Sequence, residues 1–255
     1  MTAPWRRLLL PGIATALALA VLVSLGLWQV KRLQWKEALI ARVAARIDAA
    51  PIPAPGPGNW PDLDVEDLEY QPVTVTGRLL HQYEAHLFTV LASPQGQFGG
   101  QGYFVVTPLE TADGWFVYVN RGFVPENRKS PDTRPGGQVD GPVTITGLFR
   151  EARPAPWFGV EDDTAKNIWF SRVPALFAAW NGLPVAGVAP YTIDARFDPT
   201  LAYGLPQGGE TLVEFPNSHF GYAVTWFGLA AGLLGVFFVF ARGRLRDNSR
   251  GDDQA

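Results

Sequence analysis

The hydrophobic and polar positions divide the chain into two apolar ends and a mixed middle. Residues 8–28 contain no charged side chain, and residues 220–241 form a second uncharged, apolar run. Each run is long enough to cross a hydrocarbon core of about 30 Å, because an α-helix rises about 1.5 Å per residue. The middle of the chain is mixed in polarity and rich in Pro and Gly. The pattern therefore predicts one water-exposed domain between two transmembrane helices.

The first apolar run has an alternative interpretation as a secretory signal. Arg6 and Arg7 precede it, and Ala-x-Ala triplets such as residues 16–18 occur within it. The run continues to Trp28, beyond the roughly 7–15 residues of a signal's apolar region. We therefore favour a retained anchor.

Basic residues predict the orientation of the two spans, because Lys and Arg in short loops stay preferentially on the cytoplasmic side. Residues 197–219, before the second run, contain no Lys or Arg, whereas arginines follow it at positions 242, 244, 246 and 250. The C-terminus is thus expected inside, and two spans return the N-terminus to the same side. The first span alone is ambiguous, because the basic residues after it outnumber Arg6 and Arg7.

These assignments set the expected limits of each part of the chain. The parts are a cytoplasmic N-terminus 1–7, a first transmembrane helix 8–29, a periplasmic domain 30–215 with a helical stalk 30–49, a second transmembrane helix 216–241 and a cytoplasmic tail 242–255. Arg outnumbers Lys in a chain rich in Ala, Gly and Pro, a composition common in bacteria with GC-rich genomes. We expect the protein in a bacterial inner (cell) membrane, in contact with lipid.

The period of the pattern changes along the middle domain. Residues 33–49 keep helical spacing, and the Pro-rich residues 51–62 end that helix. PVTVTGRLL from Pro72 and PVTITGLFR from Pro142 alternate with period two, which predicts two strands with a bulge or bend at Gly77 and Gly147. The repeated phrase marks two related hairpin halves or reflects β-propensity alone.

Further short segments complete the predicted fold. The strand-like runs are HLFTVLA, GYFVVTPLE, WFVYVNRGFV, YTIDARF and ETLVEF. The ADG turn at 112–114 predicts a hairpin, and residues 171–183 predict a helix that Asn181-Gly182 closes. The sum is an α+β membrane protein. Two transmembrane helices flank a periplasmic antiparallel β-rich domain, a sheet or open barrel, with one packed helix.

The composition excludes several classes of function. The chain has no cysteine, so it can form no disulfide, no thiolate metal site and no covalent c-type haem attachment. The net charge of −3 argues against a general polyanion binder, and no basic and aromatic platform for nucleic acid is present. There is no G-x-S-x-G, H-E-x-x-H or phosphate-loop motif. We therefore expect no enzyme, no catalytic residue and no nucleic-acid partner.

Polar residues of the middle domain have structural explanations. His81 and His86 would lie on opposite faces of an extended strand and could converge only around a turn, so surface or hairpin histidines are favoured over metal ligands. Arg121 lies in VNRGFVP, where we expect a strand to end at Val119 and a turn at Gly122, with anion binding by the arginine as the alternative. The acidic segment 62–69 is interpreted as a solvated loop.

His219 stands immediately before the second apolar run. If the helix begins near Asn217, then His219, Tyr222 and Trp226 share one face. Two interpretations are open. The histidine lies at the membrane interface in an aromatic belt, or its imidazole is an axial ligand of a haem iron on which the aromatic rings pack. In the second case Lys31 and Arg32, at the outer end of the first helix, face the propionates.

Small residues suggest how the two spans pack, because they let helices approach closely. Those of the second span lie in a stripe parallel to the histidine face, at Gly221, Thr225, Gly228, Gly232 and Gly235. Those of the first span are Gly12, Ala16 and Ala20. We predict contact through these two stripes, with the His/Tyr/Trp face directed elsewhere.

Several phrases together resemble the Surfeit locus protein 1 family, over nearly the whole chain. The phrases are LGLWQVKRLQWKEALI, PVTVTGRLL, GGQGYFVVTPLE, VYVNRGFVP, YTIDA and NSHFGYAVTWFGLA, in that order. The phrases at the two ends are the most specific. Ser218 stands where the family often has a second Asn.

The resemblance implies a non-enzymatic assembly factor for haem-copper cytochrome c oxidase. It implies that the protein binds haem a and assists its insertion into subunit I, with haem a synthase as a second candidate partner. The residue that matches the family's proposed haem ligand is His219. The candidate haem-binding residues are His219, Tyr222, Trp226, Arg32 and Trp28. The alternative is a haem-independent membrane scaffold that binds oxidase subunits during assembly.

Overall fold

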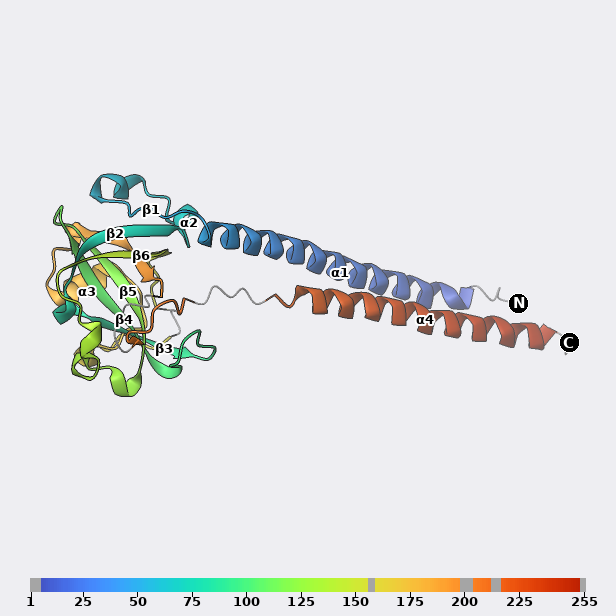
Figure 1. Ribbon diagram of the computed structural model, residues 1–255. Helices are drawn as coiled ribbons and strands as arrows, with labels where there is room; N and C mark the ends of the chain where they lie inside the picture. Colours follow the sequence, from blue (N-terminus) through green and yellow to red (C-terminus); the bar gives the residue numbers. More distant parts are fainter. Residues whose placement is uncertain (1–5, 156–158, 198–203, 212–216, 253–255) are drawn as a thin grey trace. The chain divides into compact units, whose positions relative to one another are not determined.

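The structure, a computed structural model, describes residues 6–155, 159–197, 204–211 and 217–252. It divides into two compact units, one formed by Met1–Arg42 with Glu214–Ala255 and the other by Val43–Val213. The first unit contains the long helices and the second contains the sheet. Figure 1 shows the elements of each unit.

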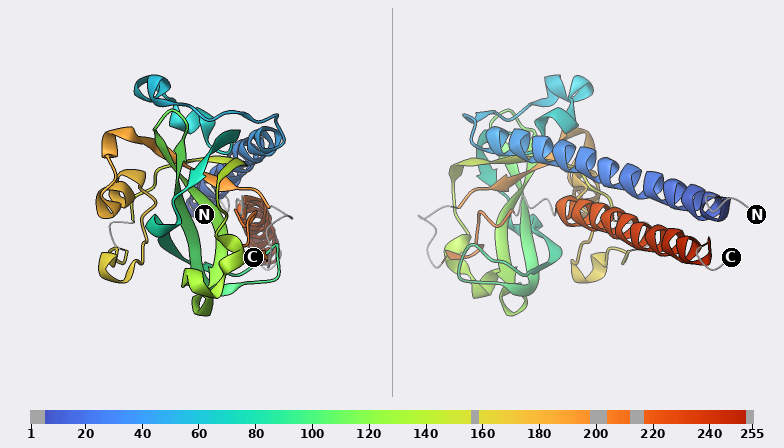
Figure 2. Two further views of the ribbon diagram at one scale, coloured as in Figure 1. Left: turned by 60° about the vertical axis from the view of Figure 1, so that its left-hand side comes forward. Right: turned by 90° about the vertical axis from the view of Figure 1, so that its right-hand side faces the viewer.

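Two long helices, α1 (Arg6–Ile47) and α4 (His219–Asp252), lie side by side in both Figures 1 and 2. Each contains a segment long and apolar enough to cross a membrane. α1 has 42 residues, so it is about 63 Å long, roughly twice the thickness of a hydrocarbon core. The predicted helical continuation beyond the first apolar run is therefore confirmed as far as Ile47.

The two helices pack together as predicted, and Gly12 of the predicted α1 stripe faces α4. The expectation that the His/Tyr/Trp face points away from α1 is wrong for His219, which contacts Gln29. A Cβ atom on Gly221, Gly228, Gly232 or Gly235 would meet no atom within 4 Å, so the predicted glycine stripe of α4 does not face α1. The buried residues of α4 include Ala223 and Ala230, each 5% exposed.

Aromatic side chains of α4 explain why the predicted stripe was wrong. A Cβ atom on Gly26 of α1 would lie 2.7 Å from the ring of Phe227, and one on Gly12 would lie 3.7 Å from the ring of Phe237. The small residues of α1 thus accommodate large rings of α4, which buries more apolar surface than glycine against glycine. Trp226 is half-buried.

The second unit is a closed five-stranded barrel. Its strands are β2 (Pro72–Leu79), β6 (Pro142–Glu151), β7 (Val188–Ala195), β5 (Phe116–Pro125) and β4 (Gly100–Thr111), and β4 pairs again with β2. Two outer strands, β3 (Ala85–Leu91) and β1 (Ile52–Pro53), pair with β4 and β2. The predicted strands at these positions are confirmed, and most of them pair antiparallel as predicted. The barrel is closed, however, and not an open barrel or sheet. A ring with an odd number of strands cannot alternate in direction throughout, and β5 pairs parallel with β7.

The repeated phrase forms two adjacent strands. β2 and β6 pair antiparallel with Val75 opposite Ile145, which occupy the same place in the two copies. The register is continuous across Gly77 and Gly147, so these glycines are not bulges. Each pairs with strands on both sides, Gly77 with β6 and β4 and Gly147 with β2 and β7.

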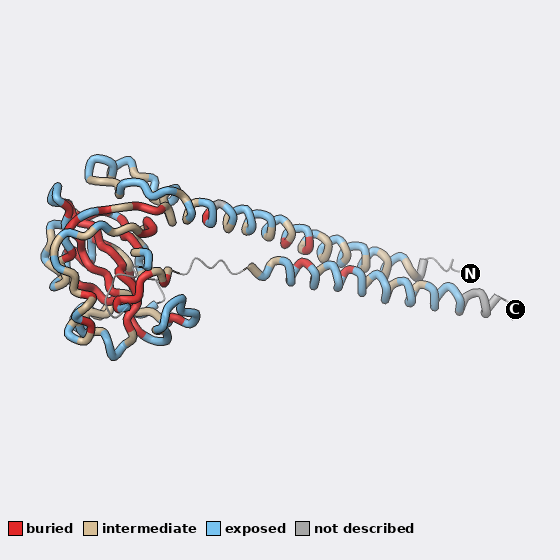
Figure 3. Tube along the Cα trace, in the orientation of Figure 1, coloured by how far each residue is buried: buried red, intermediate tan, exposed pale blue. Residues whose placement is uncertain are grey.

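The core fills the barrel and the space under one helix. Figure 3 shows the buried residues concentrated in the strands, whereas α1 and α4 are mostly exposed. The central cluster is apolar and includes Val73, Val75, Leu109, Val117, Val119, Phe149, Tyr191 and Ile193. The predicted helix is confirmed as α3 (Pro174–Asn181), with Gly182 as its left-handed C-cap. Phe177 of α3 packs against Tyr118 and Trp169, with ring centroids 5.3 and 4.9 Å apart.

Short turns connect these elements. They are η1 (Pro57–Asp62), α2 (Val65–Leu68), η2 (His81–Tyr83), η3 (Glu126–Arg128), η4 (Pro131–Thr133), η5 (Pro135–Gly137), η6 (Thr164–Lys166) and η7 (Val185–Gly187). The segment 62–69 is not simply a solvated loop, because Glu69 forms an ion pair with Arg150 at 3.0 Å. The predicted strand ETLVEF falls mainly on 212–215, outside the described residues, and Thr211 before it is not in a strand.

Candidate functional site

The first residue of α4 is His219, the residue predicted to ligate haem iron. The backbone N–H of His219 donates to Asn217 Oδ1 at 3.4 Å, and that of Tyr222 donates to the carbonyl of Ser218 at 3.3 Å. Side-chain and backbone oxygens thus satisfy amides that the first turn of a helix leaves free. The predicted helix start near Asn217 is confirmed, and it places the imidazole at the end of the apolar segment.

A glutamine of α1 contacts the candidate ligand. His219 Nδ1 lies 2.8 Å from Gln29 Oε1, and Gln29 is 8% exposed. The structure records no partner for His219 Nε2 among the described residues. Sequence reasoning missed Gln29, although a lone amide at the end of an apolar run was a detectable signal. One imidazole nitrogen is therefore held by the protein, and the other has no partner in the part of the chain that the structure describes.

The other predicted haem-binding residues lie on both helices around this contact. Tyr222 and Trp28 are 56% and 52% exposed, whereas Trp226 is half-buried on the packed side of α4. Arg32 is exposed, with its guanidinium 4.8 Å from the centre of the Trp35 ring. Because Gln29 pairs with His219, Trp28 is level with the histidine along the helices.

This donor set fits a haem-type ligand. A neutral imidazole with a free nitrogen can ligate iron, exposed aromatic rings pack on a flat macrocycle, and an arginine pairs with carboxylates. The part of the chain that the structure describes has no cluster of three or more His, Cys, Asp or Glu suited to a free metal ion.

The barrel unit contains a buried charge cluster around Glu84. Its carboxylate lies 3.1 Å from Arg121 Nη1 and 2.5 Å from Arg134 Nη2. His81 Nδ1 and His86 Nε2 lie 3.6 and 3.8 Å from its two oxygens. The histidines do not lie on the surface. The turn η2 separates the two rings, as their convergence was expected to require, and brings both to Glu84.

Arg121 also differs from its prediction. β5 continues through Arg121 and Gly122 to Pro125 instead of ending at Val119, and Gly122 adopts φ +130° within the strand. The Arg121 side chain is 5% exposed. Its guanidinium donates to Glu84 and to the carbonyl of Gly137. The anion that this arginine binds is therefore a carboxylate of the same domain.

Burial and charge set the pKa values in this cluster. Burial alone would raise the pKa of Glu84, but hydrogen bonds and the positive charges of Arg134 and Arg121 lower it to about 2. Burial lowers the pKa of His86 to about 4, and the charge of Glu84 opposes this only in part. The folded domain thus keeps Glu84 ionised and His86 neutral well below pH 6.

The barrel unit should lose stability in acid. The unfolded chain protonates His86 below its ordinary pKa of 6.5, whereas the folded domain resists down to about pH 4, so the unfolded state binds more protons across this window. The free energy of unfolding should fall by roughly 3 kcal/mol between pH 7 and pH 4 from this residue. Glu84 extends the loss from pH 4.5 towards pH 2. Urea unfolding at each pH measures this dependence.

A matched variant isolates the contribution of the histidine. His86→Gln removes the titrating group, so its unfolding free energy should depend less steeply on pH between 7 and 4 than that of the wild type. The comparison uses the slope of the unfolding free energy against pH. A loss of stability that is equal at every pH leaves that slope unchanged. Equal slopes would contradict the assignment to His86.

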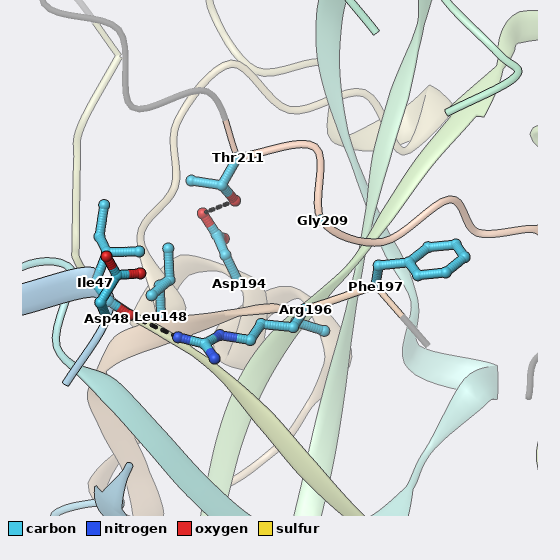
Figure 4. A pocket seen from close by; sticks show the side chains of 9 residues that line it. Ile47, Asp48, Leu148, Asp194, Arg196, Phe197, Gly209 and Thr211 are labelled. Carbon is cyan, nitrogen blue, oxygen red and sulfur yellow. Dashed lines mark hydrogen bonds between the residues drawn. The ribbon is translucent and has the colours of Figure 1, made fainter. Parts of the chain in front are cut away.

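A second buried network lies beside a pocket of the barrel unit. Asp194 accepts hydrogen bonds from Asn120 at 3.0 Å, Arg150 at 2.8 Å and Thr211 at 2.8 Å. The pocket, of about 590 Å³, is lined by Ile47, Asp48, Leu148, Asp194, Ala195, Arg196, Phe197, Gly209 and Thr211. Figure 4 shows Arg196 reaching towards Ile47, whose carbonyl accepts its hydrogen bond at 2.7 Å. Asp194 and Arg196 of this pocket bind other groups of the protein, so the network has a structural role.

Comparisons with known proteins agree with the resemblance found in the sequence. The model of the SURF1 family matches residues 16–231. Surfeit locus protein 1 of Homo sapiens is 36% identical over 232 residues, which cover 86% of this chain and 74% of that protein. The SURF1-like protein of Drosophila melanogaster is 36% identical, with 89% and 73% covered, and Surfeit locus protein 1 of Takifugu rubripes is 33% identical, with 92% and 95% covered. The chain belongs to the SURF1 family.

Proposed function

We propose that this protein is an assembly factor for haem-copper cytochrome c oxidase that binds haem a at His219 and assists its insertion into subunit I. The observation that carries the proposal is the imidazole at the start of α4, with Nδ1 held by Gln29 and Nε2 without a partner among the described residues. Membership of the SURF1 family supports the assembly role. No catalytic residue is part of the proposal.

Each residue of the site has a task in holding the haem. His219 would hold the iron through its imidazole, the exposed rings of Trp28 and Tyr222 would pack against the porphyrin, and Arg32 would pair with one of its carboxylates. Trp226 is half-buried and supports the histidine face from within the helix pair. The haem supplies the iron centre that the oxidase uses. A single histidine ligand suits a carrier that must later yield haem to a stronger ligand set.

The membrane arrangement is part of the same proposal. Residues 8–29 and 216–241 cross a bacterial inner membrane, both termini are cytoplasmic, and the barrel unit lies in the periplasm. Two candidate spans and the arginines after the second one support this arrangement. It places His219 at the outer leaflet, where subunit I and haem a synthase, the proposed partners, are also embedded.

Removing the proposed ligand should abolish haem binding. His219→Ala, purified from cells that make haem a, should lack the Soret band of the wild type, because the iron has lost its protein ligand. Trp226→Ala and Tyr222→Phe should lose haem only in part. Absorption spectra measure the haem content, and circular dichroism checks that each variant is folded. Ser218→Ala, on the exposed neighbour, is the control and should keep its haem.

An unchanged haem content in His219→Ala would refute ligation by this residue. The second candidate function is a scaffold that binds oxidase subunits without haem. This second function is favoured by an apolar surface on α3 that another protein could contact. Leu176 and Trp180 on that helix are 47% and 38% exposed. Wild-type protein that lacks a Soret band but copurifies with subunit I would support the scaffold.

A further inference from the structure

A buried amide at the contact between α1 and α4 constrains the proton of His219. Gln29 Oε1 lies 2.8 Å from His219 Nδ1, and a carbonyl oxygen can only accept a hydrogen bond. The hydrogen must therefore sit on Nδ1. A neutral imidazole has one proton, so Nε2 keeps its lone pair.

The chain's other two histidines have the opposite arrangement. His81 Nε2 lies 3.0 Å from the carbonyl of Val139, and its Nδ1 lies 3.1 Å from the guanidinium of Arg121. His86 Nδ1 lies 2.9 Å from the amide nitrogen of Asn167. Because guanidinium and amide nitrogens only donate, both rings accept at Nδ1 and carry their proton on Nε2. The sequence contains three histidines, so His219 has a tautomer of its own.

We propose that Gln29 is a positioning residue that holds His219 as the Nδ1–H tautomer and keeps Nε2 free as the ligand atom. This inference rests on the proposed function only for the group that Nε2 binds, which is the iron of a porphyrin. The tautomer is a property of the protein without haem. No feature of the sequence motifs had assigned this role to Gln29.

The burial of Gln29 explains why His219 keeps this amide as its hydrogen-bond partner. Gln29 is 8% exposed, and the residues on either side of it, Trp28 and Val30, are apolar. Water that could exchange the partners of the imidazole is scarce there, so a buried polar group keeps the partner that the fold provides. A group that accepts the second ring N–H also fixes the ring orientation and makes the ligating nitrogen more basic. Gln29 thus prepares both the orientation and the ligand strength of His219.

Nitrogen NMR of the haem-free full-length protein tests the tautomer directly. With the histidine rings labelled with ¹⁵N at pH 8, the wild type should show one ring protonated at Nδ1 and two at Nε2. His219→Ala should remove the Nδ1–H ring and so assign it. Gln29→Leu, which keeps the side-chain size and removes the acceptor, should shift His219 towards the Nε2–H form. Gln34→Leu is the matched control on an exposed position of α1 and should leave the spectrum unchanged.

Two results would overturn the inference. They are a wild type in which all three rings are protonated at Nε2, and a Gln29→Leu spectrum identical to that of the wild type. Titration with haem a in lipid nanodiscs adds a second measurement, in which Gln29→Leu should bind about 10-fold more weakly. If His219→Ala retains haem while the tautomers are as expected, the proposed function fails and the role of Gln29 as holder of the tautomer stands.

Discussion

Replacing Glu84 with alanine should lower the free energy of unfolding of the barrel unit by about 3–5 kcal/mol. The side chains of Arg121 and Arg134 are 5% and 0% exposed, and Glu84 is the carboxylate that faces both. Without it, two buried guanidinium groups lose their counter-charge and cannot recover it from water. The loop that contains η3, η4 and η5 also loses an attachment, because Arg134 joins it to Glu84.

Thermal unfolding of the purified full-length protein measures this effect. In a domain of this size a loss of 1 kcal/mol lowers Tm by about 2–4 °C, so Glu84→Ala should lower it by roughly 6–20 °C. Glu84→Gln keeps an acceptor oxygen and should be intermediate. Glu66→Ala, on an exposed residue of α2, should change Tm by less than about 2 °C. A Tm of Glu84→Ala within that same range would show that the cluster contributes little to stability.

Alanine at Gly77 or Gly147 should prevent normal closure of the barrel. A Cβ atom at Gly77 would lie 2.3 Å from the carbonyl oxygen of Glu110, and one at Gly147 would lie 2.4 Å from that of Asp194. Both obstacles are backbone atoms in adjacent strands, which cannot move without breaking ladder hydrogen bonds. We expect each substitution to cost at least about 3 kcal/mol or to abolish folding.

Gly58→Ala provides the matched control. A Cβ atom there meets no atom within 4 Å, so the same chemical change should leave Tm within about 2 °C of the wild type. Near-ultraviolet circular dichroism reports the packing of the barrel in each variant. Native spectra and native Tm values for both Gly77→Ala and Gly147→Ala would mean that the strands are not held as closely as the structure indicates.

Part of the candidate site could be predicted from local spacing. The start of a helix near Asn217 and the angular proximity of His219, Tyr222 and Trp226 follow from 3.6 residues per turn. The family resemblance added the haem. Spacing could not predict Gln29 as the partner of His219, because the two residues are 190 positions apart and the register between two helices depends on how their side chains interlock.

The fold, like the site, could be predicted from local pattern only in part. The strands, the ADG hairpin and the Gly182 cap were predictable, because alternation, turn residues and left-handed glycine act within a few neighbouring residues. Local pattern also placed the two long apolar helices. It could not show that β4 returns to β2, that β5 and β7 run parallel, or that η2 brings His81 and His86 to Glu84.

Sequence alone determined the segments of this protein and the identity of its candidate ligand, because both are expressed in the order and spacing of nearby residues. Tertiary structure alone decided which charges meet, which face of α4 packs on α1 and which nitrogen of His219 contacts Gln29. The physical reason is that these outcomes depend on steric fit and charge pairing between residues distant along the chain. Arg134, for example, meets Glu84 across 50 positions, and no local periodicity records that contact.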